Sequence, residues 1–196
     1  MLAGEFYFPQ DTKLAAVRLR AHRLIDRFNR TDDAQTLLRA GLLKKILGHA
    51  GAHLEMTPPI RFDYGCNTYV GDRCYFNFNA TFLDCAEIRF GDDVLVGPNV
   101  SFLTPLHPLL APERNFFFDA EGKKRNIEYA LPIRVESGVW IGGGVTVNPG
   151  VTIGAGTVIG SGSVVTRDVP PGVLAFGSPC RVIRKLTAAD SIRRTE

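Results

Sequence analysis

Aliphatic residues recur every six positions in the C-terminal half of the chain. The residues in this register are Val135, Ile141, Val147, Ile153, Ile159 and Val165. Small or aliphatic residues fill the position four further along each time, namely Val139, Val145, Val151, Thr157, Ser163 and Val169. This period matches neither the 3.6 residues of a helix nor the alternation of a half-buried strand. It predicts an all-β solenoid, a parallel β-helix whose short strands end at corners that repeat in sequence.

An earlier block follows the same period less regularly. Its register residues are Val70, Phe76 and Phe82 and then, after a shift of two positions, Phe90, Val96 and Phe102. The positions four further along hold Cys74, Ala80, Ala86, Val94 and Val100. The shift predicts a bulge or a longer corner near residues 86–89.

Two helices are expected before the repeats. The first spans about 11–29 with Asp11 as N-cap, and its apolar face holds Leu14, Val17, Ala21, Leu24, Ile25 and Phe28. The second spans about 33–47, where Asp32 and Gln35 have the spacing of an N-cap and its third helical residue. Its apolar stripe is Leu38, Leu42 and Ile46, and Gly48 follows as a stop. Gly41 inside the segment argues against one unbroken helix.

The repeats are interrupted by an excursion at residues 103–132, which is rich in proline, phenylalanine and charge. A long excursion in a compact domain is usually functional or disordered. Its aromatic residues favour a loop that docks on another surface. The predicted organisation is a helical segment at 1–56, a hexapeptide-repeat domain at 57–185 and a C-terminal tail at 186–196. The helical segment is expected to cap one end of the solenoid, and the chain from Asp168 onward is expected to cap the other.

Composition narrows the class of protein without identifying it. Of the 196 residues, 45% are hydrophobic, and the net charge of +3 gives no argument for a nucleic-acid partner. No stretch is apolar enough for a membrane span, and the N-terminus lacks the pattern of a signal peptide. The four cysteines form no CxxC pair and are expected to be buried thiols, with Cys74 as an inward filler. We therefore expect a cytoplasmic protein.

Short motifs run in order along nearly the whole chain, from the opening Met1-Leu2-Ala3-Gly4 onward. They include Asn77-Phe78-Asn79, Leu83-Asp84, Gly91-Asp92-Asp93-Val94, Pro98-Asn99-Val100, His107-Pro108, Val139-Trp140-Ile141-Gly142-Gly143, Asn148-Pro149-Gly150-Val151 and Gly177-Ser178-Pro179-Cys180-Arg181-Val182. Together they resemble the hexapeptide acyltransferases of the maltose and galactoside O-acetyltransferase type. The resemblance implies a left-handed parallel β-helix, acetyl-CoA as donor, and a homotrimer with active sites between neighbouring subunits.

His107 is the candidate general base. Acetyl transfer from a thioester to a hydroxyl needs a group that removes the hydroxyl proton, and a neutral imidazole suits this task. The residue stands where the chain leaves the repeats, between Pro105 and Pro108, which restrict the backbone. A loop histidine without a chemical role is the alternative. The remaining histidines are expected on the surface: His22, His49 and His53.

Other candidates follow from the resemblance. Asn77 is expected to touch the acceptor and to stabilise the tetrahedral intermediate, although an asparagine ladder with Asn79 is an alternative. Asp63 is expected to bind the acceptor through hydrogen bonds from its hydroxyls, with a turn-forming role as the alternative. Asp84 is a further acceptor candidate. The galactoside enzymes have an aspartate where this chain has Cys85, which puts galactoside specificity in doubt.

Two residues have less certain roles at the acceptor site. Glu128 is expected to orient His107 across the site, with a solvated loop carboxylate as the alternative. Trp140 is expected to flank the acceptor or the donor, with simple packing as the alternative.

The donor is expected along the second repeat block. Gly142, Gly143 and Gly144 lack a Cβ and so allow pantetheine to approach the backbone. The resemblance places coenzyme A contacts at Gly143, Ser161, Thr166, Arg167, Arg181 and Arg184. Arginines there would meet the phosphates. No metal is expected, because a zinc site of the kind seen in the related carbonic anhydrases needs three histidines.

The expected reaction is direct transfer of acetyl to a sugar hydroxyl in a ternary complex. On resemblance, the acceptor is the 6-OH of a glucose-type sugar such as maltose or glucose. Other acceptors remain as alternatives, namely a galactoside, an amino sugar, a lipo-oligosaccharide or a xenobiotic. A non-catalytic trimeric binding or assembly module is the alternative from a different class.

Overall fold

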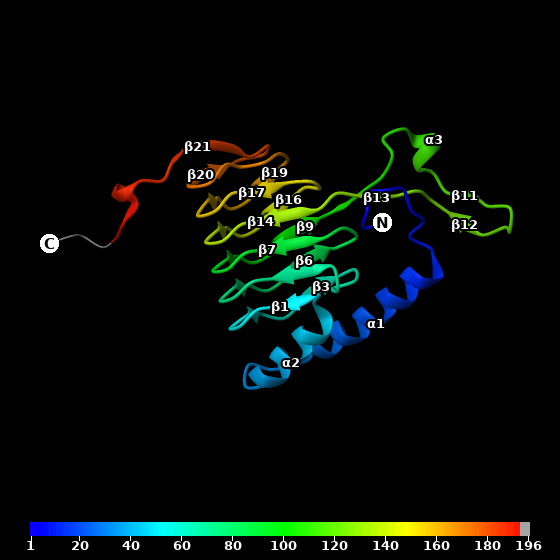
Figure 1. Cartoon of the computed structure of the whole chain (residues 1–196), viewed down its shortest axis with the longest axis horizontal. Coiled ribbons are helices and arrows are strands. Elements are labelled where there is room, and N and C mark those ends of the chain that lie inside the picture. The colour runs from blue at the N-terminus through cyan, green and yellow to red at the C-terminus, as the bar shows by residue number, and fades with distance from the viewer. Residues whose placement is uncertain (193–196) are drawn as a thin grey trace.

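The computed structural model describes residues 1–192 and shows a parallel β-solenoid with helices across its N-terminal end (Figure 1). Three sheets run along the solenoid, parallel except at the last strand of the second sheet, and are numbered in the order in which the chain first enters them. The first sheet contains β1 (His49–Ala50), β4 (Thr68–Val70), β7 (Ile88–Phe90), β14 (Ile133–Val135) and β17 (Thr152–Ile153). The second contains β2 (Glu55–Met56), β5 (Tyr75–Phe76), β8 (Leu95–Val96), β15 (Trp140–Ile141), β18 (Val158–Ile159), β20 (Val173–Phe176) and β21 (Arg181–Lys185). The third contains β3 (Ile60–Phe62), β6 (Ala80–Leu83), β9 (Ser101–Leu103), β16 (Thr146–Val147) and β19 (Val164–Val165).

The six-residue register forms the core of the solenoid, which confirms the predicted fold class. All the register residues from Val70 to Val165 and their partners four positions on are buried. In the first block, phenylalanines fill the interior, and Phe82 stacks between Phe62 and Phe102 at centroid distances of 4.3 and 5.3 Å. These rings explain why the first block is less regular in composition than the second. A phenylalanine fills more of the interior than an aliphatic residue does, so its neighbours in the block vary in size.

Two sets of corners matter for function. The second-to-third corners precede third-sheet strands and comprise residues 57–59, 77–79, 97–100, 142–145 and 160–163. The third-to-first corners follow third-sheet strands and comprise residues 63–67, 84–87, 148–151 and 166–168. The corner at 84–87 accommodates the predicted two-residue shift.

The helices cap the open end of the solenoid. Helix α1 (Thr12–Asn29) begins as predicted at Asp11, whose carboxylate accepts hydrogen bonds from the backbone N–H groups of Lys13 and Leu14. At its other end, the Asn29 side chain forms the two backbone hydrogen bonds that a neighbouring strand would otherwise form with β3. Its side chain accepts from the N–H of Ile60 (2.8 Å) and donates to the C=O of the same residue (2.9 Å). The edge of β3 is therefore closed by one side chain.

Helix α2 (Thr36–Ile46) begins later than predicted, since Gln35 is the N-cap and Asp32 instead accepts from Ala34 N–H in the preceding turn. The helix continues unbroken through Gly41. Two residues predicted on apolar faces, Val17 and Leu38, are exposed. The repeats also begin before the expected boundary at residue 57, because β1 and β2 already pair with β4 and β5.

The excursion is a folded arm rather than a bare loop. Strand β10 (Pro105–Leu106) pairs with β13 (Tyr129–Ala130), and β11 (Phe117–Phe118) pairs with β12 (Lys124–Arg125), with the short helix α3 (Ala111–Arg114) between them. The arm stands away from the solenoid, and the N-terminus lies beside it (Figure 1). Phe116 and Phe118 are largely exposed, so docking of the arm on another surface stays a prediction.

At the C-terminal end, β21 folds back antiparallel on β20 and is followed by a short 3-10 helix (Ala188–Asp190). Cys74, Cys85 and Cys180 are buried as predicted, whereas Cys66 is exposed because its corner turns the side chain outward. No helix in the described part of the chain is long and apolar enough to cross a membrane.

Candidate active site

The arm holds the candidate base and its carboxylate partner. His107 follows β10 and Glu128 precedes β13, so the pairing of these two strands brings the residues together. The His107 Nε2 lies 3.7 Å from the Glu128 Oε1. The imidazole is 46% exposed and the Glu128 side chain only 16% exposed. The contact is longer than a hydrogen bond, but it places a carboxylate beside an imidazole that remains accessible from outside.

Tyr7 holds the second oxygen of that carboxylate. Its hydroxyl donates to Glu128 Oε2 at 2.8 Å, and the two backbones exchange hydrogen bonds of 2.8 and 3.0 Å. Burial, together with the neighbouring Cys85 and Glu128, raises the pKa of Tyr7, so the hydroxyl keeps its proton and stays a donor. Tyr7 could not be predicted as a site residue from the sequence, because the segment before α1 has no periodic pattern.

Asp63 and Cys85 lie in successive third-to-first corners behind this group. The Cys85 thiol donates to Asp63 Oδ2 at 3.4 Å. Burial raises the pKa of Asp63, although the thiol donor, Arg18 and His22 act in the opposite direction. Burial also raises the pKa of Cys85, which keeps its sulfur as a protonated donor. Asp63 is partly exposed and can accept hydrogen bonds from a ligand.

Asp84 has a different position from the one expected. Its side chain is fully buried, and its carboxylate accepts from the backbone N–H groups of Tyr64 (2.8 Å) and Asn67 (3.3 Å) and from the Thr68 hydroxyl (3.2 Å). Burial raises its pKa to about 6. Its oxygens thus hold the corner at 63–67 and are not exposed to an acceptor, so the structure does not support the predicted acceptor-binding role of Asp84.

The other candidates lie at a different edge of the solenoid. Asn77, Gly143 and Ser161 occupy the second-to-third corners, at the beginning of the third-sheet strands, whereas His107 lies beyond their end. The Asn77 Oδ1 accepts from Phe78 N–H, and the Asn79 amide donates to Asn99 Oδ1 at 3.0 Å. Asn79 therefore belongs to the asparagine ladder. Within one chain, the fold does not bring Asn77 to His107.

The remaining residues predicted to contact coenzyme A lie near the C-terminal end. Thr166 and Arg167 are exposed in the last third-to-first corner, and Trp140 is 54% exposed on the outer face of the second sheet. Arg181 and Arg184 are exposed on β21. Arg184 forms a bidentate ion pair with Asp190 at 2.6 and 2.8 Å, so a phosphate there would have to replace that partner.

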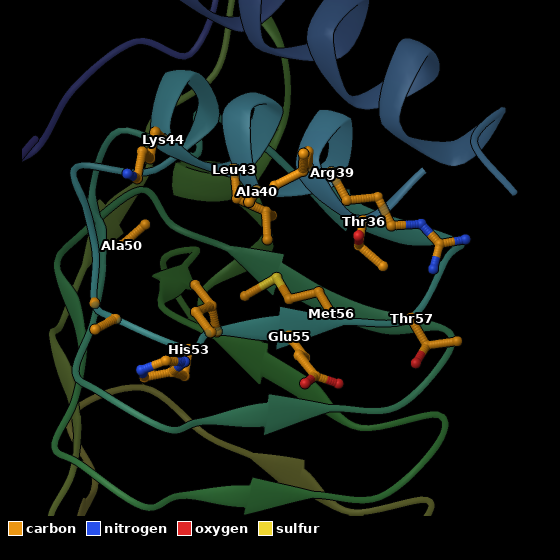
Figure 2. Close-up of a pocket in the computed structure, with 14 residues that line it drawn as sticks. Thr36, Arg39, Ala40, Leu43, Lys44, Ala50, His53, Glu55, Met56 and Thr57 are labelled. Carbon is orange, nitrogen blue, oxygen red and sulfur yellow. The ribbon is translucent and has the colours of Figure 1, made fainter. Parts of the chain in front are cut away.

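A separate cleft of about 450 Å³ lies between α2 and β2 (Figure 2). Leu43 and Met56 line it together with the polar side chains of His53 and Glu55. No predicted site residue is among its lining residues. Within residues 1–192, no group of three or more His, Cys, Asp or Glu side chains is arranged to hold a metal ion.

Comparison with known proteins places the fold and the site in a class. Residues 1–51 match the maltose acetyltransferase hexapeptide capping motif, and residues 132–167 match the bacterial transferase hexapeptide family of six repeats. A capped solenoid of such repeats, with a histidine and a carboxylate on its arm, defines a hexapeptide-repeat acyltransferase.

Individual relatives narrow this class. The galactoside O-acetyltransferase of Escherichia coli is 38% identical over 188 residues, covering 96% of this chain and 88% of that protein. The crystal structure of a maltose O-acetyltransferase from Clostridium difficile is 40% identical, with a TM-score of 0.88 and 95% of both chains covered. A solved galactoside acetyltransferase in complex with coenzyme A is 38% identical, with a TM-score of 0.88 and coverage of 96% of this chain and 90% of that one. The chain belongs to the galactoside and maltose O-acetyltransferase family and is an acetyltransferase.

Proposed function

We propose that this acetyl-CoA-dependent acetyltransferase transfers acetyl to the 6-OH of a glucose-type sugar such as maltose or glucose. The pair of His107 and Glu128 is the observation that supports the chemistry most directly, since the two side chains lie 3.7 Å apart and the imidazole is accessible. The likeness to a maltose O-acetyltransferase supports the sugar. Cys85, in place of the aspartate expected for galactosides, favours glucose-type acceptors over galactosides.

The proposed mechanism is direct transfer in a ternary complex. His107 takes the proton of the sugar hydroxyl as the oxygen attacks the thioester carbonyl. Asn77 stabilises the tetrahedral oxyanion, a contribution that is typically worth about 10²–10³ in turnover. The C–S bond then breaks, and the sulfur leaves as the thiol of coenzyme A, taking up the proton held by the imidazole. Asp63 binds sugar hydroxyls on the other side of His107.

A homotrimer would complete this site. His107 and Asp63 lie at one end of the third-sheet strands, and Asn77, Gly143 and Ser161 lie at the other. Side-by-side packing of solenoids would bring the His107 edge of one subunit to the Asn77 edge of its neighbour. Coenzyme A would lie between them, against Gly143, Ser161, Thr166 and Arg167, with its phosphates near Arg181 and Arg184.

The test measures release of coenzyme A from acetyl-CoA with maltose, glucose, glucosamine and a β-galactoside. We expect turnover with a glucose-type sugar and a loss of about 10²–10⁴-fold in His107→Ala, as for a positioned general base. The same variant should retain its affinity for acetyl-CoA in a titration. Unchanged turnover in His107→Ala would refute the base, and a preference for the β-galactoside or glucosamine would replace the proposed acceptor.

A further inference from the structure

The segment before α1 makes a specific contact with the candidate catalytic pair. We propose that Tyr7 is a positioning residue for the acetyl transfer, because it fixes the Glu128 carboxylate that orients His107. This inference rests on the proposed function, in which His107 is the base. It assigns a role in catalysis to a segment that would otherwise serve only to cap the solenoid.

The contact between Tyr7 and Glu128 has the features of a fixed interaction. Tyr7 is 9% exposed, and its hydroxyl donates to Glu128 Oε2 at 2.8 Å. Residues 7 and 128 also form an antiparallel bridge through both backbone groups. Aromatic pairs lie on either side of this bridge, with Phe6 against Tyr129 at 5.5 Å and Phe8 against Phe117 at 6.1 Å. The N-terminal segment is therefore bound to the arm along three successive residues.

The two oxygens of Glu128 have separate partners. Oε1 faces the His107 imidazole, and Oε2 accepts the Tyr7 hydroxyl. A glutamate side chain on a solvated arm would otherwise sample several rotamers, and ordering it costs free energy each time it must face the histidine. Tyr7 removes this freedom in advance. A misplaced catalytic group can cost as much as about 10²-fold in rate.

The same hydroxyl also connects the base to the acceptor side. Tyr7 lies beside the Cys85 thiol, which in turn donates to Asp63. A continuous row of polar groups thus runs from His107 through Glu128, Tyr7 and Cys85 to Asp63. Tyr7 is the central member of this row and is supplied by a part of the chain outside the repeats.

The experiment compares Tyr7→Phe, Glu128→Gln, the double variant and Tyr69→Phe, using the sugar that wild type acetylates. Tyr7→Phe keeps the ring and removes only the hydroxyl. Tyr69, on the first sheet, is the matched control, because its ring packs on Arg89 and not on Glu128. We expect kcat to fall about tenfold in Tyr7→Phe with the KM for acetyl-CoA unchanged, and Tyr69→Phe to match wild type.

The double variant separates positioning from general stability. If Tyr7 acts through Glu128, Tyr7→Phe causes no further loss in a Glu128→Gln background. Full multiplication of the two losses would overturn the inference, as would wild-type kcat in Tyr7→Phe. If His107→Ala stays active, the proposed function itself fails, and this outcome is distinct from the other two.

Nuclear magnetic resonance of the histidine side chains tests the inference without measuring turnover. With ¹⁵N-labelled histidine, the signal absent in His107→Ala identifies that imidazole among the four histidines. We expect Tyr7→Phe to shift this signal and to leave those of His22, His49 and His53 in place. An unmoved His107 signal would overturn the inference.

Discussion

At the scale of single residues, Asp84 shows how a side chain can be essential to a corner without touching a ligand. Three donors from residues 64–68 converge on its carboxylate, and its side chain has no exposed surface. Those hydrogen bonds favour the ionised form, but burial has the larger effect and raises the pKa to about 6. The corner that carries Asp63 is therefore coupled to pH.

The stability of the fold should depend on pH through this one group. Its pKa of about 6 in the folded protein compares with 3.8 for an ordinary aspartate, so its contribution is full below pH 3.8 and is lost as the pH rises through 6. The loss amounts to at most about 3 kcal/mol, at 1.36 kcal/mol for each pKa unit. Urea unfolding of wild type and Asp84→Asn at fixed protein concentration, between pH 4 and 7, measures it.

As the pH rises from 4 to 7, the free energy of unfolding of wild type should fall relative to that of Asp84→Asn, because only wild type loses the contribution of a protonated Asp84. Asp26→Asn, on the exposed face of α1, is the control and should follow wild type. Parallel pH curves for wild type and Asp84→Asn would contradict the assignment.

Sequence reasoning reached some of these residues and not others for identifiable reasons. His107 can be predicted because it lies between prolines where the repeat pattern stops, and Asp63 and Cys85 because the family resemblance covers their positions. Tyr7 cannot be predicted, since its partner Glu128 is 121 positions away and nothing in the local pattern links them. The acceptor role predicted for Asp84 is not supported, because its motif does not reveal that the side chain turns inward.

At the scale of elements, the solenoid depends on backbones that approach one another closely at the corners. A Cβ added at Gly154 would lie 2.4 Å from the backbone nitrogen of Pro171 in the next turn. By contrast, a Cβ at Gly41 in α2 would meet nothing within 4 Å. Gly154 is required because successive turns of the repeat approach each other closely at this corner. Gly41, which made the helix uncertain in sequence, is only an exposed helical position.

These two glycines provide a matched pair of substitutions. Gly154→Ala should destabilise the protein by about 1–3 kcal/mol, because the neighbouring backbone cannot move away cheaply. Gly41→Ala should stabilise it by up to about 1 kcal/mol through helix propensity. Denaturant unfolding of both variants checks the signs. If Gly154→Ala unfolds at the wild-type midpoint, the turns are not in the close contact described.

The bounds of the helices and strands are harder to predict from the sequence than their presence. Helix α2 starts at Thr36 because Asp32 closes a turn rather than capping the helix. Strands β1 and β2 belong to the repeats, since Ala50, Met56 and Phe62 continue the six-residue register one turn earlier and pair with Val70, Phe76 and Phe82. This turn is hard to recognise in the sequence because its register begins at a small residue, Ala50, shortly after a helix.

At the scale of the whole molecule, the site residues are divided between two edges of one solenoid. His107 lies at the end of the third-sheet strands and Asn77 at their beginning. If neighbouring subunits join these edges, each active site takes His107 from one chain and Asn77 from another.

Complementation tests this arrangement. His107→Ala and Asn77→Ala should each be nearly inactive alone. After the two are unfolded together and refolded as a mixture, random assembly of a cyclic trimer would restore both residues in about one site in four. Coenzyme A release should recover accordingly, and sedimentation should give the mass of three chains. A mixture no more active than its components would place both residues in the same subunit's site or exclude Asn77 from it.

The antiparallel strand β21 has one more consequence. The last strand of a parallel sheet exposes unpaired backbone N–H and C=O groups, and a strand of another chain can pair with them. Repeated pairing of this kind between solenoids would produce a filament. Because β21 runs against the direction of every other strand in the second sheet, a second copy cannot continue the parallel ladder of that sheet at this end. The reversed strand therefore opposes end-to-end stacking through the second sheet and favours lateral packing as the route to assembly.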